Sequence, residues 1–183
     1  QADIDERVDE DIAALVALQS GDGGFVYWSL RDPSHPFVTV QVAHALLLAR
    51  ANGYSVPDGT LTSAMAYLAD IESHYPSEWG EQERNTTSAY ALWVRNLAGQ
   101  RDTAKAEELY RRAGDDLTVE AIAWLWSSVE DGGLRDDIER TINNRAVDTA
   151  GAATFTTDYD DRAWVIMQSD RRTDGIVLDA LIA

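Results

Sequence analysis

The chain has 183 residues, 45% of them hydrophobic and 9% aromatic, which is enough to bury the core of one domain without disulfides. Its 32 acidic and 15 basic residues give a formal net charge of -17, which would repel a nucleic-acid backbone or an anionic lipid surface. We therefore expect no nucleic-acid partner. We also expect no membrane insertion, because no apolar run approaches the roughly 20 residues that cross a bilayer. The chain contains no cysteine, which excludes disulfides, thiol catalysis and thiolate metal sites within it.

The first half of the chain alternates two kinds of predicted helix. Residues 3–19 carry one apolar stripe and gather acidic side chains at the amino end, where the helix dipole favours anions. Residues 38–51 are apolar almost all the way round and end before Gly53, a residue typical of helix ends. A one-sided helix then begins at Pro57, and residues 87–98 are again apolar on nearly every side.

The second half continues the alternation. Asp102 is the expected cap of a charged, one-sided helix, and residues 118–129 are apolar on every side. Residues 134–144 return to a single stripe, after Gly132 and Gly133 break the preceding helix, and the final run at 176–182 is apolar.

The segment before this final run has a different period. Residues 152–156 and 163–167 look extended, and polar residues 158–161 join them. This pattern predicts a short β-hairpin inserted before the last helix.

The alternation predicts the architecture. A helix with one apolar stripe covers a core, whereas a helix that is apolar on every face must be enclosed by other helices. We therefore expect an all-α fold of the α/α-toroid class, a partial ring of about four outer and inner helix pairs, with the hairpin near the C-terminus. We expect one domain over residues 1–183. Because the chain begins without Met and ends inside an apolar run, we also expect a fragment of a larger multidomain protein.

The densest motif follows the first predicted helix and reads Gln19-Ser20-Gly21-Asp22-Gly23-Gly24-Phe25, with Trp28 shortly after it. Its glycines permit a tight turn with positive φ, and the Asp22 carboxylate can accept hydrogen bonds from nearby amides. Phe25 and Trp28 could plug the mouth of the ring. We interpret the motif as a structural turn, and a ligand-binding loop is the alternative.

This motif, followed by the apolar run 39–51 and by residues 53–57, resembles the thioester-type toroid domain of bacterial alpha-2-macroglobulins. The resemblance continues in residues 89–94 and 170–181. It implies a large exported protein, anchored in the periplasm, that traps proteases after a bait region is cut. The partners would then be the other domains of the parent chain and the target proteases. For this segment the resemblance implies no enzymatic activity and no cofactor.

The family's thioester joins a Cys to a Gln in a Cys-x-x-Gln motif, which this chain lacks because it has no cysteine. The sequence Trp79-Gly80-Glu81-Gln82 copies the spacing with Trp in the place of Cys, and we interpret it as a chance loop. In some relatives a histidine after the Gly-Phe motif attacks the thioester. His35 lies in that interval, so we keep it as a functional candidate beside its interpretation as a surface-loop histidine. The three scattered histidines predict no metal site.

A different class of function is suggested by Asp158-Tyr159-Asp160-Asp161, which copies the Asp-x-Asp-Asp acid motif of triterpene-type cyclases. Those enzymes also use toroids, and one of their Asp residues must stay protonated in order to protonate an alkene. A toroid enzyme, cyclase-like or glycan-processing, that uses Asp158, Asp160 and Asp161 is therefore the alternative function. In a hairpin turn, however, water would keep these carboxylates ionised. A binding module for a basic partner is the third possibility, since it suits the charge.

Overall fold

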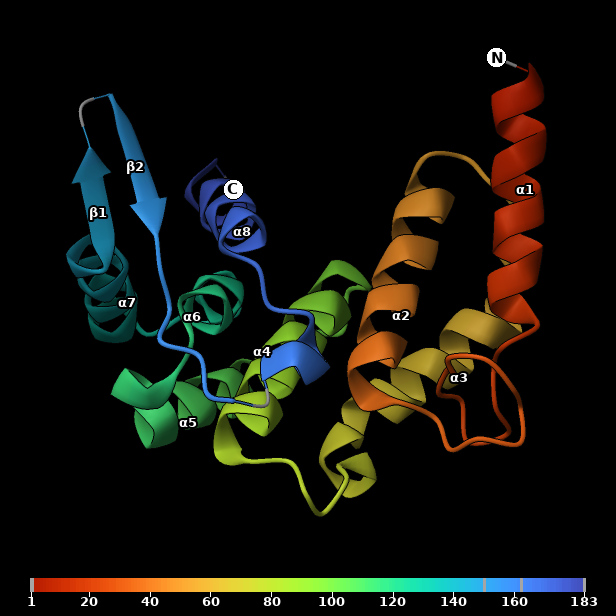
Figure 1. The fold of residues 1–183 in the computed structure, drawn as a ribbon, viewed down its shortest axis with the longest axis horizontal. Coiled ribbons are helices and arrows are strands. Elements are labelled where there is room, and N and C mark those ends of the chain that lie inside the picture. The colour runs from red at the N-terminus through yellow and green to blue at the C-terminus, as the bar shows by residue number, and fades with distance from the viewer. Residues whose placement is uncertain (1, 150, 162, 183) are drawn as a thin grey trace. The chain divides into compact units, whose positions relative to one another are not determined.

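A computed structural model describes residues 2–149, 151–161 and 163–182, and Figure 1 shows their secondary structure. The two ends of the predicted domain, Gln1 and Ala183, lie outside the described residues. The chain divides into two compact units, Gln1–Tyr75 and Pro76–Ala183, so the single domain expected over residues 1–183 stays a prediction. Among the described residues, no helix has the length and apolar character needed to cross a bilayer.

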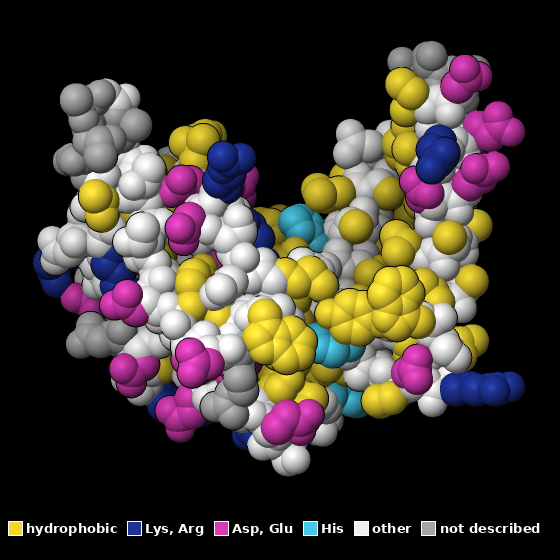
Figure 2. Space-filling view, in the orientation of Figure 1, with side chains coloured by type: hydrophobic (Ala, Val, Ile, Leu, Met, Phe, Trp, Pro, Cys, Tyr) yellow, Lys and Arg dark blue, Asp and Glu magenta, His cyan; other side chains and the backbone are white. Residues whose placement is uncertain are grey.

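The first unit consists of α1 (Ala2–Val16), α2 (Pro36–Ala51), α3 (Asp58–Ala69) and a short 3-10 helix, η1 (Ile71–His74). Pro36 takes the first position of α2, where its missing N–H is no loss and its fixed φ suits the helix. Helix α2 packs against α3. Helix α1 is amphipathic as predicted: Ile12 is buried, while acidic side chains line the exposed face (Figure 2).

The second unit contains five α-helices and two 3-10 helices among its described residues. They are α4 (Glu81–Leu97), α5 (Thr103–Ala113), η2 (Gly114–Asp116), α6 (Val119–Trp126), α7 (Gly132–Asn144), η3 (Ala163–Ile166) and α8 (Asp170–Ile182). The cap predicted at Asp102 is confirmed, because its side chain accepts the Lys105 N–H. Helix α7 begins two residues earlier than predicted, since Asp131 caps it by accepting the Leu134 N–H.

Helices α4 and α6 form the interior of the second unit. All residues from 119 to 125 in α6 are buried, and α6 packs against both α4 and α8 (Figure 1). Trp124 is only 3% exposed, and its ring stacks on that of Tyr90 in α4 with centroids 4.2 Å apart. Helices α5 and α7 bury one face each, through Ala106, Leu109 and Tyr110 in α5 and through Ile138 and Ile142 in α7. The predicted division into enclosed and covering helices is therefore confirmed for α4 to α7.

Helix α8 differs from the enclosed helix that its apolar sequence predicts. Thr173 and Val177 are buried, but Leu178, Leu181 and Ile182 are exposed. Its amino end is held instead by an ion pair, in which the Arg172 guanidinium contacts the Glu120 carboxylate of α6 at 2.8 Å. The apolar run of α8 is thus covered on one side only, and its amino-acid composition alone does not indicate which of its side chains are buried.

A two-stranded antiparallel hairpin precedes α8, as predicted, but only one of its strands lies where we expected it. Strand β1 (Ala146–Thr149) pairs with β2 (Ala152–Phe155), with Ala146 opposite Phe155. The strand expected at residues 163–167 was wrong, because residues 163–166 form η3, in which Ala163 and Ile166 are buried. A short apolar run without alternation fits a buried helical turn as well as a strand.

Candidate functional site

The glycine-rich motif forms a loop between α1 and α2 that is tied to α3. The Gln19 side chain donates through Nε2 to the Gly23 carbonyl at 3.0 Å and to the Thr60 carbonyl at 2.9 Å. Gln19 and Phe25 also form an isolated antiparallel bridge, which closes the loop at its base. One amide side chain therefore shapes the loop and anchors it to the start of α3.

The glycines at positions 23 and 24 are needed because other atoms lie where a side chain would begin. Gly23 has φ of +90°, and a Cβ on it would lie 2.4 Å from the Ser63 carbonyl oxygen. A Cβ on Gly24 would lie 2.6 Å from the Tyr67 ring and equally close to Ser34 Cβ. The backbone of the loop thus packs directly against α3, in agreement with a structural turn.

Asp22 organises the other side of the loop. Its Oδ1 accepts the Gly24 N–H at 3.0 Å, and its Oδ2 accepts the Ser34 hydroxyl at 2.6 Å. Partial burial acts to raise the pKa of Asp22, but hydrogen bonds from Ser34, Gly24 and Ser20 and the charge of His74 together outweigh it and hold the pKa below its ordinary value. Ser34 Oγ also lies 3.2 Å from the Tyr67 hydroxyl, and burial raises the pKa of that phenol to about 12. Asp22 is therefore an ionised acceptor in a hydrogen-bond network.

The two aromatic residues of the motif have different environments. Phe25 is fully buried, and its backbone N–H donates to Thr39 Oγ1 at 2.8 Å. Trp28 is 87% exposed and stacks loosely on Tyr27, with ring centroids 6.3 Å apart. The expectation that Trp28 plugs an opening was wrong, because it follows a turn that directs it to the surface.

His35 has a local structural role. It is the N-cap of α2, where Nδ1 accepts the Val38 N–H at 3.4 Å, and the edge of its ring meets Tyr27 at a centroid distance of 4.9 Å. The side chain is half-buried, and this burial lowers the pKa of the imidazole. The geometry suits a neutral imidazole with Nδ1 as acceptor. A role of His35 in thioester chemistry stays a prediction.

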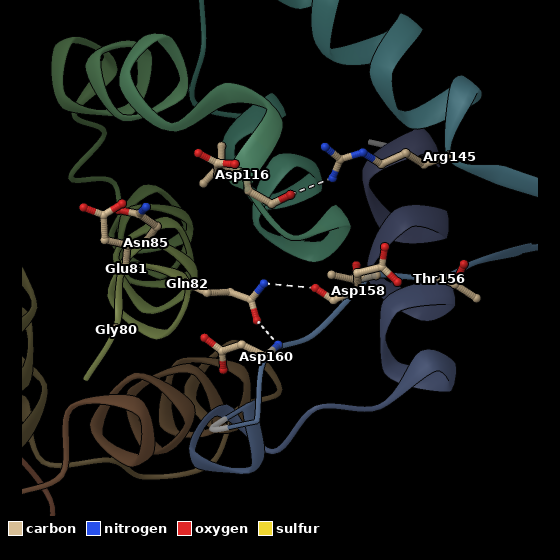
Figure 3. A pocket seen from close by; sticks show the side chains of 11 residues that line it. Gly80, Glu81, Gln82, Asn85, Asp116, Arg145, Thr156, Asp158 and Asp160 are labelled. Carbon is tan, nitrogen blue, oxygen red and sulfur yellow. Dashed lines mark hydrogen bonds between the residues drawn. The ribbon is translucent and has the colours of Figure 1, made fainter. Parts of the chain in front are cut away.

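The second unit contains a pocket of about 630 Å³, shown in Figure 3. It lies at the amino end of α4, beside the segment that follows β2. Its lining is mainly polar: Gly80, Glu81, Gln82, Asn85, Asp116, Leu117, Arg145, Thr156, Thr157, Asp158 and Asp160. Among the described residues, no group of three His, Cys, Asp or Glu side chains is placed to hold a metal ion.

The acidic motif of residues 158–161 contributes to this pocket. Asp158 and Asp160 line it, whereas Asp161 does not. The motif lies in the segment between β2 and η3, so our prediction that it lies in a hairpin turn was wrong. Four carboxylate side chains line the pocket beside the guanidinium of Arg145, whose Nη1 donates to the Leu117 carbonyl at 2.6 Å. Such a pocket suits polar ligands better than a hydrocarbon substrate.

Gln82, which belongs to the stretch that we interpreted as a chance loop, holds the acidic segment in place. Gln82 donates through Nε2 to the Asp158 carbonyl at 3.1 Å and accepts the Asp160 N–H on Oε1 at 2.9 Å (Figure 3). Glu83 is fully buried, and its Oε2 accepts the Gly80 N–H at 2.7 Å. Glu81 and Gln82 are the first residues of α4, so the loop interpretation was wrong for them, whereas Trp79 and Gly80 precede the helix. A Glu at the third helical position that accepts the N–H of the N-cap residue is one half of a capping box, and this Glu was the available signal.

The chain is similar to known proteins in sequence and in structure. No family model matches the chain. It is 28% identical to the alpha-2-macroglobulin of Rickettsia conorii over 90 residues, which are 49% of this chain and 5% of that protein.

Solved structures match the fold along nearly the whole chain. Native alpha-2-macroglobulin from Escherichia coli, spanning domain MG7 to the C-terminus, has a TM-score of 0.79 at 17% identity and covers 97% of this chain. The Escherichia coli protein activated by porcine elastase has a TM-score of 0.76 at 20% identity over 96% of this chain. Salmonella alpha-2-macroglobulin reacted with methylamine has a TM-score of 0.71 at 18% identity over 91%. This likeness confirms the predicted fold class.

The chain is much shorter than the proteins it matches. It spans 28% of the matched Escherichia coli fragment, 16% of the elastase-activated protein and 11% of the Salmonella protein. The similarity in sequence and the likeness in fold point to one group of proteins. The resemblance of this chain to bacterial alpha-2-macroglobulins, predicted from its motifs, is confirmed.

Proposed function

We propose that this chain is a non-catalytic toroid segment of a bacterial alpha-2-macroglobulin-like protein that inhibits proteases by trapping them. The observation that carries the proposal is the fold likeness, with a TM-score of 0.79, over 97% of the chain. The sequence similarity to the Rickettsia conorii protein supports the same conclusion independently. Under this proposal the parent protein is exported to the periplasm. The segment then works with other domains of its parent and meets target proteases through it.

The glycine-rich motif supports a structural role for the segment. The side chains of Gln19 and Asp22 are occupied by hydrogen bonds within the fold, and the backbone at Gly23 and Gly24 is pressed against α3. None of these groups is arranged as a nucleophile beside a base. The motif therefore acts as a structural loop that connects α1 to α2 and holds both to α3 through hydrogen bonds and packing.

Reactive thioester chemistry would require a cysteine from elsewhere in the parent polypeptide, because this chain contains none. Methylamine is a direct probe of that chemistry, since an amine attacks a thioester and adds its mass to the acyl carbon. One solved relative, the Salmonella protein, is described as reacted with methylamine. The same reaction on the parent protein separates a thioester trap from a trap that works by entrapment alone.

A cyclase-like activity is poorly supported by the acidic pocket. A carbocation cyclase needs a protonated acid above an apolar, aromatic-lined cavity, whereas Leu117 is the one large apolar side chain among the described residues that line this pocket. Replacing both Asp160 and Asp161 by Asn in the parent would abolish an activity that depends on them. The same double variant would leave protease trapping unchanged.

The decisive experiment exposes the parent protein to a protease and follows its shape by small-angle X-ray scattering and its bound protease by native gel. A trap changes its radius of gyration when it is cleaved and retains the protease. The matched control is the same protease with its active site blocked, which should produce neither effect. Cleavage of the parent without a change in shape and without retention of the protease would contradict the proposal.

A further inference from the structure

The pocket at the amino end of α4 carries negative charge that comes from three separate elements. Its carboxylates are Glu81 from α4, Asp116 from η2, and Asp158 and Asp160 from the segment after β2. Within the described part of the chain, no hydrogen bond or ion pair reaches the side chain of Glu81, Asp116 or Asp158. Arg145 is the one cation among the described lining residues. The pocket therefore attracts positively charged groups.

The fold holds these groups around the pocket before any ligand binds. Glu81 and Asn85 are four residues apart in α4, so they lie on the same face of the helix. The Gln82 amide bonds to both the Asp158 carbonyl and the Asp160 N–H, which keeps the acidic segment beside the first turn of α4 (Figure 3). A site that is organised in advance loses less conformational freedom on binding.

Asn85 adds a hydrogen-bond donor of a different kind to the lining. The residue is only 9% exposed, and it lines the pocket (Figure 3). Its Oδ1 accepts a hydrogen bond from Arg112 Nη2 at 3.4 Å, which fixes the orientation of the amide. No residue that the structure describes supplies an acceptor to its Nδ2. A largely buried donor without a partner costs free energy, so an acceptor on a ligand would stabilise it.

The carboxylates and the amide together define the chemistry of the ligand. The carboxylates favour a cation, and they are not grouped as metal ligands among the described residues, so an ammonium or guanidinium group fits them better than a metal ion. The Asn85 amide requires an acceptor, which a simple alkylamine lacks. A lysine or arginine residue of a peptide carries both a cationic head and carbonyl oxygens. A pocket of about 630 Å³ is large enough for one such residue.

We propose that this pocket binds a lysine or arginine residue of a peptide. The carboxylates of Glu81 and Asp158 contact its cationic group, and Asn85 Nδ2 donates to one of its carbonyl oxygens. This site goes beyond the proposed function, because it uses only residues of the second unit and does not require that the parent protein trap proteases.

The test is a titration of the intact chain with Nα-acetyl-lysine amide and with Nα-acetyl-arginine amide, followed through the backbone amides by NMR. We expect shifts at residues 81–85 and 156–160, and weaker binding as the salt concentration rises. Nα-acetyl-glutamine amide has the same carbonyl groups without the charge and should shift none of these amides. Equal shifts with the glutamine probe, or none with either basic probe, would overturn the proposal.

Variants assign the charge contacts. Asp158→Asn and Glu81→Gln should each weaken binding of the lysine probe by about two- to fivefold, the range measured for exposed ion pairs. Asp161→Asn is the matched control, because Asp161 is an exposed acid of the same segment that does not line the pocket. It should bind as the wild type does. Equal weakening by Asp158→Asn and Asp161→Asn would contradict a site in this pocket.

A second probe assigns the amide contact. n-Butylamine carries the same ammonium group without a carbonyl and should bind the wild type more weakly than the lysine probe. In Asn85→Ala the two probes should bind alike. If n-butylamine binds the wild type as strongly as the lysine probe does, the role of Asn85 is refuted. This comparison on the wild type holds even if Asn85→Ala does not fold.

Discussion

Replacing Gly23 by Ala tests whether the glycine-rich motif is a structural loop held to α3. Gly23 has φ of +90°, and a Cβ at this position would lie 2.4 Å from the Ser63 carbonyl oxygen and 2.9 Å from its carbon. Both atoms belong to the backbone of α3, which cannot move aside as a flexible side chain would. The loop or the helix must therefore shift.

Two costs contribute to the expected loss of stability. An alanine held at positive φ costs about 1–2 kcal/mol, and forcing an extra carbon into a packed contact costs about 1–3 kcal/mol. We therefore expect Gly23→Ala to lower the free energy of unfolding by about 2–5 kcal/mol. Gly53→Ala is the matched control, because Gly53 also has φ of +90° but no atom lies within 4 Å of its added Cβ. It should lose about 1–2 kcal/mol.

Urea unfolding measures the difference, with amide exchange in α2 and α3 as a reporter of the first unit. This reporter is needed because the chain has two compact units, whose unfolding need not coincide. Equal losses for Gly23→Ala and Gly53→Ala would refute the claim that the loop backbone is pressed against α3.

Three further predictions concern single positions. Phe25→Ala should lower the free energy of unfolding by about 3–5 kcal/mol because Phe25 is fully buried. Trp28→Ala should change it by no more than about 0.5 kcal/mol because Trp28 is exposed. Similar losses for both variants in thermal unfolding would contradict the placement of these rings. Arg172→Met leaves the buried carboxyl of Glu120 without its cation and should cost about 3–5 kcal/mol at neutral pH. Burial already raises the pKa of Glu120, and loss of the Arg172 cation raises it further. This variant should therefore be most stable below the ordinary glutamate pKa and lose stability as pH rises through the raised value. A series of urea unfolding curves in which the cost of the substitution does not change with pH would argue against this. Met167→Asn should raise the melting temperature by a few degrees, corresponding to about 1 kcal/mol, because Met167 has φ of 49° and Asn tolerates this region better. An unchanged or lower melting temperature would show that the backbone at Met167 is not strained.

Most of the helices could be predicted from sequence because their signals are local. Periodicity separates the enclosed α6 from the one-sided α7, and a side-chain cap such as Asp102 marks where a helix begins. The hairpin was predicted only in part. Which segment pairs with β2 depends on contacts that are not local in sequence. The apolar run at residues 163–166 has no periodicity that distinguishes the 3-10 helix it forms from a strand.

The candidate sites show the same limit. The glycines and Asp22 of the loop were recognised because turn chemistry is local, but the contact of Gly23 with Ser63 depends on how α3 returns to the loop. The acidic pocket depends on Gln82 and Asp158, which are 76 residues apart and have no sequence signal that joins them. Burial of Glu83 likewise results from the packing of distant segments. Sequence alone therefore identified residue types, and the fold decided which of them meet.

Hydrogen exchange within the second unit tests the central claim most directly, namely that helices apolar on every side lie inside and one-sided helices cover them. The comparison is between α6, whose residues 119 to 125 are all buried, and α7, in which Ile138 and Ile142 are buried. We predict that the α6 amides exchange only through opening of the whole unit and are the slower set. The α7 amides should exchange faster, through local opening. Amides in α7 that are protected as strongly as those in α6 would contradict the account.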